Sequence, residues 1–556
     1  MTDIHAGLLQ KEASIQEKDR FSFLNRKRFR ILLLVIGAVV MALCTVTSDL
    51  SALQWFVMIP AGLVILRLTD DTSMRLRTYY AYGLIYFWAV YIVIFHWFVA
   101  MYPLSFTGLS PSGAAAVVLA GVFGLSLLQA FFSAWIFVLY GLASRSKWSL
   151  RLPFLRPFLF SALYVLAEWF QNFGWWGVPW GRLPIGQSGM LWMLQTAEWF
   201  GSYWITFLLV SVNLCFAYAI LNVTLRRLSI LTACGILTVN TACGAVLYYA
   251  DRETGEPFRV AAIQGNITNK WDRDTLESTQ EVYRAYTLVA AAEGADLIIW
   301  PETALPYDMT LSPTVMRFVC NLAKETETMI LFGAFRSLTL ETEEDVDYNS
   351  LFLVLPDGTV HDTVYDKHQL VPFGEFIPLK NILTTIYPPL TEVAMLEEDL
   401  SRGELGKNME TAYGSLGGMI CFDSIYERVA LSAVQNGAQL LCLSSNDAWF
   451  LDSAAIYMHH NQAKLRAIET GRYLVRSGNS GITSVIRPNG EVLTEIKPLI
   501  DGYVISDVYF RSDRTLYSYI GNTFVYLLLG GVGILSAERI YELISDRIKR
   551  KQSESL

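Results

Sequence analysis

The stretch Ser415-Leu416-Gly417-Gly418-Met419-Ile420-Cys421 is a short apolar run that ends in a cysteine. The run predicts a buried strand, and the residues from Ser424 to Asn436 predict a helix. A thiol at a strand-to-helix turn lies at the edge of a sheet, where a substrate can reach it. Cys421 is therefore a candidate nucleophile.

Two other reactive side chains follow predicted strands in the same region. Glu302 follows the segment Leu297–Trp300, and Lys367 follows Thr359–Tyr365. A base, a cation and a thiol at three strand ends suit acyl transfer through a covalent intermediate. Taken singly, each of the three residue types is more often structural than catalytic, so the prediction depends on the set.

The region around these residues alternates between strand-like and helix-like segments. Tight hairpins are predicted at Leu355–Thr359 and Arg487–Glu491. This alternation indicates a layered α/β sandwich. The strand predictions are Arg259–Ile263, Leu297–Trp300, Met329–Gly333, Ser350–Leu355, Thr359–Tyr365, Leu416–Cys421, Leu440–Ser444, Tyr473–Arg476, Ile482–Ile486 and Tyr503–Val508, and the helix predictions are Thr275–Glu293, Pro313–Thr326, Ser424–Asn436 and Tyr457–Thr470. The apolar segment Pro378–Leu405 interrupts the pattern and is either a surface excursion or a lid that touches lipid.

Before and after this α/β region, the chain consists mainly of apolar segments long enough to span a bilayer, which takes ~20 residues per helix. About eight spans are expected, seven before the α/β region and one after it. The second is short and contains Pro60, and the fourth is long enough to tilt or to extend beyond the bilayer. The predicted spans are Ile31–Thr47, Ala52–Leu66, Tyr82–Met101, Gly113–Leu142, Pro157–Phe173, Phe200–Leu221, Ser229–Tyr249 and Tyr517–Ser536.

Lysine and arginine alternate between the loops in a way that predicts orientation. Basic residues cluster in both tails and in every second loop, whereas Ser48–Ser51 and Tyr102–Ser112 contain none. Basic loops stay in the cytoplasm, so both tails are predicted to be cytoplasmic and the α/β region to lie outside. One miscounted span would instead place that region inside. The expected organisation is a cytoplasmic tail (1–30), seven spans (31–250), an outer domain (251–515), and a last span with a cytoplasmic tail (516–556).

The remaining composition argues against several other functions. There is no basic, aromatic-rich patch for nucleic acid, and the seven cysteines show no zinc spacing. His459-His460 lacks a third ligand at a suitable spacing, so a helix face is the simpler interpretation. We expect no metal and no cofactor. Arg182, among the tryptophans of an outer loop, is predicted to belong to an interfacial belt or to contact a lipid headgroup.

Several longer motifs resemble apolipoprotein N-acyltransferase, a bacterial inner-membrane enzyme whose periplasmic domain belongs to the nitrilase superfamily. The resemblance covers nearly the whole chain, including the order of the spans. The matching motifs are Gln264-Gly265-Asn266-Ile267, Trp300-Pro301-Glu302-Thr303-Ala304, the run from Tyr365 to Pro378, the strand into Cys421, Ser445-Asn446-Asp447-Ala448-Trp449-Phe450, and Gly478-Asn479-Ser480-Gly481-Ile482-Thr483.

The resemblance implies a nitrilase-like α-β-β-α sandwich and a catalytic triad carried by Glu302, Lys367 and Cys421. It also implies that Glu375 is a second important carboxylate and that Trp271 lies at the site. The implied donor is a membrane phospholipid, typically phosphatidylethanolamine. The implied acceptor is the α-amino group of the diacylglyceryl-cysteine of a maturing lipoprotein.

The motif departs from the family at the nucleophile, where Cys421-Phe422-Asp423 stands in place of the usual Cys-Tyr-Glu. Phenylalanine keeps the ring but loses the hydroxyl, and aspartate keeps the charge on a shorter arm. Phe422 and Asp423 are thus expected to support the site or to affect the acceptor preference. Asn446 and Asp447 follow a predicted strand and are expected to shape the pocket.

Three alternatives stay open from the sequence. The first is a membrane-tethered amidase that uses the same triad, and the second is a related acyltransferase with a different amine acceptor. The third is a transporter-like protein with an inert outer domain. In the preferred interpretation, Glu302 deprotonates Cys421, and Lys367 with nearby backbone N–H groups stabilises the oxyanion.

Overall fold

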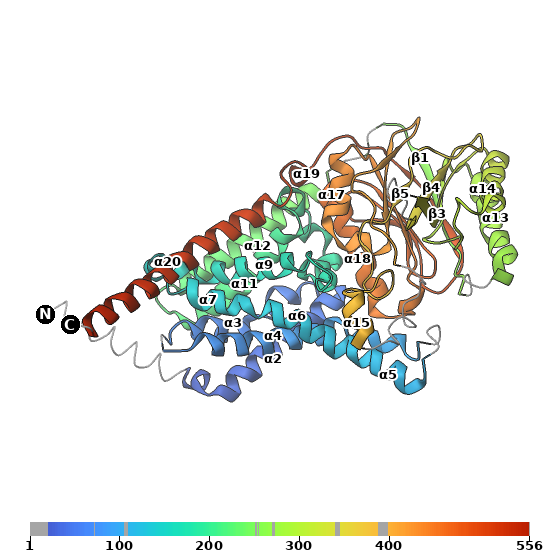
Figure 1. The fold of residues 1–556 in the computed structure, drawn as a ribbon. Helices are drawn as coiled ribbons and strands as arrows, with labels where there is room; N and C mark the ends of the chain where they lie inside the picture. The colour runs from blue at the N-terminus through green and yellow to red at the C-terminus, as the bar shows by residue number, and fades with distance from the viewer. Residues whose placement is uncertain are drawn as a thin grey trace.

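The computed structural model describes residues 21–71, 73–104, 109–250, 253, 255–268, 273–339, 345–386 and 399–554. A helical half built from the two ends of the chain lies beside an α/β half built from its middle (Figure 1). The helical half corresponds to the apolar parts of the sequence, and the α/β half corresponds to its more polar middle.

A helix occupies each of the eight predicted spans. Five of these helices are long and apolar enough to cross a membrane, namely Lys27–Val46, Pro111–Ala143, Ser202–Leu221, Arg226–Tyr248 and the one that starts at Thr523. The chain is therefore a membrane protein. The helices at the predicted spans are α2 (Lys27–Val46), α3 (Ile59–Leu68), α4 (Leu76–Ile94), α5 (Pro111–Leu119), α6 (Ser126–Ser133), α7 (Trp135–Ala143), α9 (Arg156–Phe170), α11 (Ser202–Leu221), α12 (Arg226–Tyr248) and α20 (Thr523–Glu554).

Two of the spans show the irregularities that their sequences predict. The second begins as a short 3-10 turn and becomes α-helical only at α3, with Pro60 in the first helical turn, where its missing N–H is tolerated. The fourth combines α5, a π-helical segment Ala120–Leu125, α6 and α7. Figure 1 shows α5 projecting beyond its neighbours on the side of the α/β half.

The described residues of the α/β half form two six-stranded sheets. The first has the order β12-β1-β2-β3-β4-β5, with β1 (Phe258–Gln264), β2 (Leu297–Ile299), β3 (Met329–Thr339), β4 (Asp345–Val354), β5 (Tyr365–Asp366) and β12 (Gly502–Val508). The second has the order β11-β10-β9-β8-β7-β6, with β6 (Asn408–Glu410), β7 (Ser415–Ile420), β8 (Leu440–Ser445), β9 (Leu474–Gly478), β10 (Thr483–Ile486) and β11 (Val492–Ile496).

The central strands of each sheet run parallel. In the first sheet β1, β2 and β3 are parallel, and in the second β7, β8 and β9 are parallel. The carboxyl ends of parallel strands lie at one edge of a sheet, which is where α/β proteins bind ligands. Glu302 follows β2, Cys421 follows β7 and Asn446 follows β8.

The sheets pack face to face between two layers of helices. Val260 and Leu331 of the first sheet share a buried core with Leu416 and Val475 of the second. Helices α13 (Leu276–Ala292) and α14 (Pro313–Thr326) cover the first sheet, and α17 (Glu427–Gln435) and α18 (Ala454–Thr470) cover the second. The predicted α-β-β-α sandwich is confirmed.

The layer formed by α17 and α18 also packs against the spans. Val429 of α17 and Leu465 of α18 belong to the same buried cluster as Trp180 and Leu209 of the helical half. One hydrophobic core therefore runs from the spans into the second sheet. Helices α13 and α14 lie at the far side of the α/β half from the spans (Figure 1). Short helices α8 (Lys147–Arg151), α10 (Ala197–Phe200), α15 (Lys380–Ile386) and α19 (Leu516–Ile520) complete the described helices.

The strand predicted at Thr359–Tyr365 is wrong over most of its length. Only Tyr365 joins the ladder as part of β5, and Val360 makes an isolated bridge. The His361 imidazole accepts the backbone N–H of Thr363 at 3.0 Å, and this side-chain bond competes with ladder formation. Similarly, the helix predicted from Ser424 begins as a 3-10 turn, Cys421–Ile425, and becomes α17 only at Glu427.

Candidate active site

Cys421 lies at a strained turn directly after β7. Its φ of 47° is in the left-handed region, which non-glycine residues rarely adopt. Such strain is concentrated at functional sites because the surrounding structure must hold it in place. The strand-to-turn placement expected from the sequence is therefore found, with the cysteine partly exposed.

A glycine in β7 lets the loop that carries Lys367 approach the nucleophile strand. A Cβ at Gly418 would lie 2.7 Å from the ring of Tyr365, closer than real Cβ contacts allow. Tyr365 is the first residue of β5, and Lys367 follows two positions later. Close packing at Gly418 thus brings the cation to the edge where Cys421 stands.

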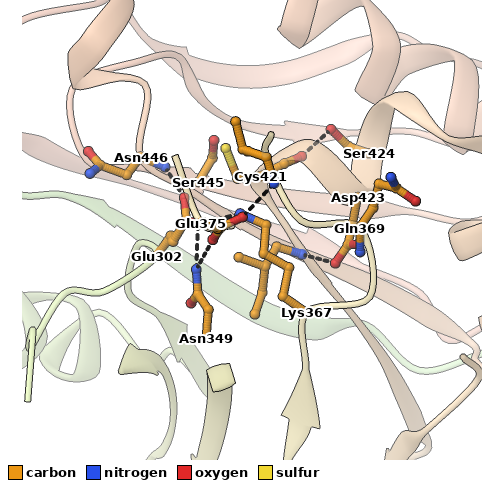
Figure 2. Close-up of polar contacts among 12 residues, drawn as sticks. Glu302, Asn349, Lys367, Gln369, Glu375, Cys421, Asp423, Ser424, Ser445 and Asn446 are labelled. Atoms are coloured by element: carbon orange, nitrogen blue, oxygen red, sulfur yellow. Dashed lines mark hydrogen bonds and ion pairs between the residues drawn. The ribbon is translucent and has the colours of Figure 1, made fainter. Parts of the chain in front are cut away.

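The Lys367 ammonium is held between two carboxylates (Figure 2). Its Nζ donates to Glu302 Oε1 at 2.9 Å and to Glu375 Oε1 at 2.9 Å. The Lys367 side chain is only 1% exposed. Burial by itself would lower the pKa of Lys367, but the two carboxylates raise the pKa well above its ordinary value. The lysine is therefore a fixed positive charge at neutral pH.

Asn349, in β4, is a site residue that the sequence analysis missed. Its Nδ2 donates to Glu302 Oε1 at 2.8 Å and to Glu375 Oε1 at 3.0 Å. Its backbone carbonyl accepts the N–H of Lys367 at 2.8 Å. One buried residue thus contacts both carboxylates through its side-chain amide and the Lys367 backbone through its own carbonyl. The only sequence signal is a polar residue at the start of the apolar run Ser350–Val354, and such residues commonly face solvent.

Glu302 links the two sheets. Its Oε2 accepts the backbone N–H of Asn446, which follows β8 in the second sheet, at 2.8 Å. The Asn446 side chain accepts a hydrogen bond from Asn479 Nδ2 at 3.2 Å. The loop after β2 fits closely over β3, because a Cβ at Gly333 would lie 2.5 Å from the Thr303 nitrogen. These contacts hold the Glu302 carboxylate in one orientation.

The charges around Cys421 keep its thiol protonated at rest. Burial raises the thiol pKa, the Glu302 carboxylate raises it further, and the Lys367 ammonium only partly offsets them. Figure 2 shows the sulfur beside these side chains. A thiol with a raised pKa needs a base when it attacks, because the thiolate is the reactive form. Glu302 is the carboxylate that acts most strongly on this thiol, ahead of Asp447.

Asp423 and Phe422 lie behind the nucleophile and support its turn. The fully buried Asp423 carboxylate accepts hydrogen bonds from Gln369 N at 2.7 Å, Tyr365 Oη at 2.8 Å and Ile420 N at 3.0 Å. Burial raises the pKa of Asp423 to about 6. The shorter acidic side chain thus ties the Lys367 loop to the end of β7.

Phe422 faces the helical half of the molecule. Its ring stacks on that of Trp180 with centroids 6.4 Å apart and packs edge-on against Tyr426 at 5.4 Å. The position therefore uses an aromatic ring for packing between the two halves. Trp271, the remaining expected site residue, lies outside the described residues.

A second buried polar cluster lies next to Cys421. His459 Nδ1 contacts Asp447 Oδ1 at 2.9 Å, its Nε2 is 3.1 Å from the Cys421 carbonyl oxygen, and Arg476 pairs with Asp447 Oδ2 at 2.5 Å. Possible ligand atoms of Cys421, Asp447 and His459 lie within 4.8 Å of one another. The sequence analysis found no such partners for His459. The buried Arg476 guanidinium already neutralises Asp447 and disfavours a cation there, so we interpret the cluster as support for the Cys421 turn.

Arg182 forms a buried ion pair between the two halves. Its NH1 donates to Glu427 Oε2 at 3.0 Å, and both side chains are almost fully buried. Asn172 also donates to this carboxylate, at 2.7 Å. The predicted headgroup contact of Arg182 is wrong, because its guanidinium is enclosed between the spans and α17.

Comparison with family models agrees with this architecture. Residues 259–512 match the carbon-nitrogen hydrolase family, and residues 37–215 match the apolipoprotein N-acyltransferase N-terminal domain. An amidase of known structure from Nesterenkonia sp. is 16% identical, with a TM-score of 0.37, over 49% of this chain and 97% of its own. The fold and the matched domains define a membrane enzyme with a carbon-nitrogen hydrolase domain.

Two full-length relatives specify the class further. An apolipoprotein N-acyltransferase from Geobacter metallireducens is 29% identical over 91% of this chain and 94% of the relative. One from Gloeobacter violaceus is 30% identical over 89% of this chain and 91% of the relative. The chain belongs to the apolipoprotein N-acyltransferase family, and it is an acyltransferase.

Proposed function

We propose that this enzyme moves a fatty acyl chain from a membrane phospholipid, through a thioester on Cys421, to the α-amino group of the diacylglyceryl-cysteine of a bacterial lipoprotein. The donor we favour is phosphatidylethanolamine. The observation that carries the proposal is the Lys367 ammonium fixed between Glu302 and Glu375 beside a strained cysteine. The relatives' names supply the acceptor class.

In the first half-reaction, Glu302 removes the thiol proton and the Cys421 sulfur attacks the ester carbonyl carbon. A carbon–sulfur bond forms, and the carbonyl electrons move to the oxygen. When this oxyanion collapses, the bond to the glycerol oxygen breaks. Glu302 then returns its proton to that oxygen, and a lysophospholipid leaves. A covalent intermediate divides one slow transfer into two faster steps.

In the second half-reaction, the lipoprotein amine attacks the thioester carbon. Glu302 takes a proton from the nitrogen and gives it to the departing sulfur, which restores the thiol. Because the same base serves both steps, donor and acceptor use the site in turn. This order predicts ping-pong kinetics.

Lys367 stabilises the oxyanion in both steps. An ammonium has three N–H donors, and two of them contact Glu302 and Glu375. The third can donate to the oxyanion. Removing one donor of this kind costs ~3 kcal/mol of transition-state stabilisation in comparable sites. Glu375 and Asn349 position the ammonium, and Trp271 remains the expected substrate contact.

The proposed setting is the bacterial inner membrane, with residues 251–515 in the periplasm and both tails in the cytoplasm. The alternation of basic loops supports this orientation. A test uses a membrane-impermeant maleimide on intact spheroplasts that carry Leu311→Cys, at a side chain 77% exposed in the α/β half. Labelling without lysis is expected. Labelling of Leu311→Cys only after lysis would contradict the orientation. The matched control is Trp148→Cys, which lies on the predicted cytoplasmic side and should be labelled only after lysis.

The reaction itself is tested by intact mass spectrometry of the purified protein after incubation with a defined phosphatidylethanolamine. We expect a mass increase of one acyl chain, and this increase should be absent in Cys421→Ala. Adding a diacylglyceryl lipopeptide should remove the acyl group from the enzyme and form an N-acyl amide on the lipopeptide. Release of free fatty acid alone, or turnover of a water-soluble amide, would instead favour the amidase alternative. Discharge by another amine but not by the lipopeptide would indicate a different acceptor.

A further inference from the structure

An apolar slot lies in the helical half, and Cys421 is not among the residues that line it. It has a volume of about 290 Å³ and is bounded by α6, α7, α9 and α20. Its floor is formed by Leu166 and Ala167, which are buried. At its mouth Trp135, Phe170 and Leu529 are 51%, 44% and 46% exposed. Because these helices lie at predicted spans, the mouth faces lipid rather than water.

One end of the slot is polar. Gln129, Gln171 and Trp176 line it there, at the level where α9 ends and the outer loop begins. The Gln129 side chain donates to the Trp176 carbonyl oxygen, and the Trp176 ring stacks on Phe132 with centroids 5.8 Å apart. The Trp176 indole N–H is buried and has no hydrogen-bond partner among the described residues. An unpaired buried donor costs free energy unless a ligand accepts from it.

We propose that this slot binds one acyl chain of an outer-leaflet phospholipid, with the ester carbonyl near Trp176. An apolar cavity in a membrane is filled by hydrocarbon, since water gains no partners there. The indole N–H would donate to the ester carbonyl, which satisfies the orphan donor. The volume is at the small end of ligand sites and suits a single chain segment. The site is separate from the one at Cys421, and the proposal does not require acyl transfer.

The slot is nevertheless connected to the catalytic half. Gly177, which lines the slot, accepts a hydrogen bond from Tyr426 Oη at 3.0 Å. Tyr426 packs against Phe422, the neighbour of Cys421. A lipid that orders the loop at Trp176 and Gly177 would therefore also order the wall behind the nucleophile. We assign the slot a structural role in seating the α/β half on the membrane.

The test is photo-crosslinking of the full-length protein in nanodiscs that contain phosphatidylethanolamine with a diazirine near the end of one acyl chain. The label is expected on the segments 135–139 and 166–167, at the apolar part of the slot, which is where the end of the chain would lie. Leu529→Trp narrows the mouth and should lower this labelling roughly fivefold, because the chain loses its contacts. The matched control is Leu527→Trp, two residues away on the same helix. The Leu527 side chain is 69% exposed and does not line the slot, so this variant should be labelled like the wild type.

The outcomes separate this proposal from the catalytic one. Equal labelling of the two tryptophan variants, or label spread evenly over α12 and α20, would overturn the slot as a binding site. Trp176→Phe keeps the ring and removes the donor, so unchanged labelling in that variant would overturn the role of the indole. Failure of the acyl-enzyme test would leave the labelling pattern unaffected, since no step at Cys421 enters it.

Discussion

The Glu302 charge raises the pKa of the resting Cys421 thiol. In the mechanism that we propose, the same carboxylate removes the thiol proton when a substrate is bound. Glu302 would therefore both protect the cysteine from adventitious reagents and activate it for the ester. Lys367 works in the other direction, because its ammonium lowers the thiol pKa.

Glu302→Gln should make Cys421 react faster with iodoacetamide while acyl-enzyme formation is lost. Removing the carboxylate lowers the thiol pKa, and at a fixed pH below that pKa the thiolate fraction rises about tenfold for each unit. The measurement is the alkylation rate between pH 7 and 9, followed by mass spectrometry. Lys367→Met should slow the same alkylation, because it removes the cation that lowers the pKa.

Glu375→Gln is the matched control for this experiment. Glu375 contacts Lys367 but acts on the thiol less strongly than Glu302 does. Its alkylation rate should stay near that of the wild type. An alkylation rate in Glu302→Gln that is equal to or lower than wild type would contradict the proposed electrostatics.

Asn349→Ala should lower the rate of acyl-enzyme formation roughly tenfold to a hundredfold, because two buried carboxylates each lose a donor worth ~1–3 kcal/mol. The measurement is single-turnover acylation with phosphatidylethanolamine. A positioning role predicts that the pH dependence of acylation also changes, since Glu302 and Glu375 lose the amide that fixes them. If only thermal stability falls and the pH profile is unchanged, Asn349 has a purely structural role.

At the scale of single elements, the turn after β7 depends on the glycine beneath it. Gly418→Ala places a methyl group 2.7 Å from the Tyr365 ring, so β5 and the Lys367 loop must shift. Overpacking of this kind costs about 1–3 kcal/mol. We expect a lower melting temperature in nanodiscs and slower acylation. Gly235→Ala on α12 is the control, because its methyl group would meet no atom within 4 Å, and it should unfold like the wild type.

The sequence allowed the strong elements to be predicted and missed the weak ones. The central strands, the helices that cover them and the strand-end positions of Glu302 and Cys421 follow from long apolar patterns. β6 and β11 were missed because both are edge strands whose residues mix apolar and polar types. The strand before Lys367 was overpredicted because the backbone N–H of Thr363 bonds to the His361 imidazole instead of to a neighbouring strand.

The supporting residues of the site could not be predicted in the same way. Asn349 is adjacent to Glu302 only because β3 and β4 form a hairpin that places its amide next to that loop. The pairing of Asp447 with His459 and Arg476 needs the β8–β9 register and the position of α18. Such contacts depend on tertiary packing, which residue types alone do not specify.

At the scale of the whole molecule, the Arg182–Glu427 pair joins the two halves. Burial alone would raise the pKa of Glu427, but the Arg182 and Arg466 guanidinium groups together with hydrogen bonds outweigh burial and hold the pKa below its usual value. The partners are 245 residues apart in the chain. Both charges are therefore satisfied only when the α/β half is seated on the spans.

Arg182→Met should destabilise the protein by ~3–5 kcal/mol, because it removes the ion-pair partner of a buried carboxylate. The double variant Arg182→Met with Glu427→Met should recover much of this loss, since well-packed apolar residues replace a buried pair at little cost. The measurement is thermal unfolding in nanodiscs. A double variant as unstable as the sum of the two single variants would show that the residues do not interact.

The continuous core through α17 and α18 limits how the catalytic half can exist. Cut away from the spans, residues 251–515 would present Val429, Leu465 and their neighbours to water, together with the lone carboxylate of Glu427. Such a fragment would not fold on its own, and it would aggregate unless detergent covered its apolar surface. The two halves therefore cannot be produced as separate folded proteins. The transmembrane helices are needed for the α/β half to fold.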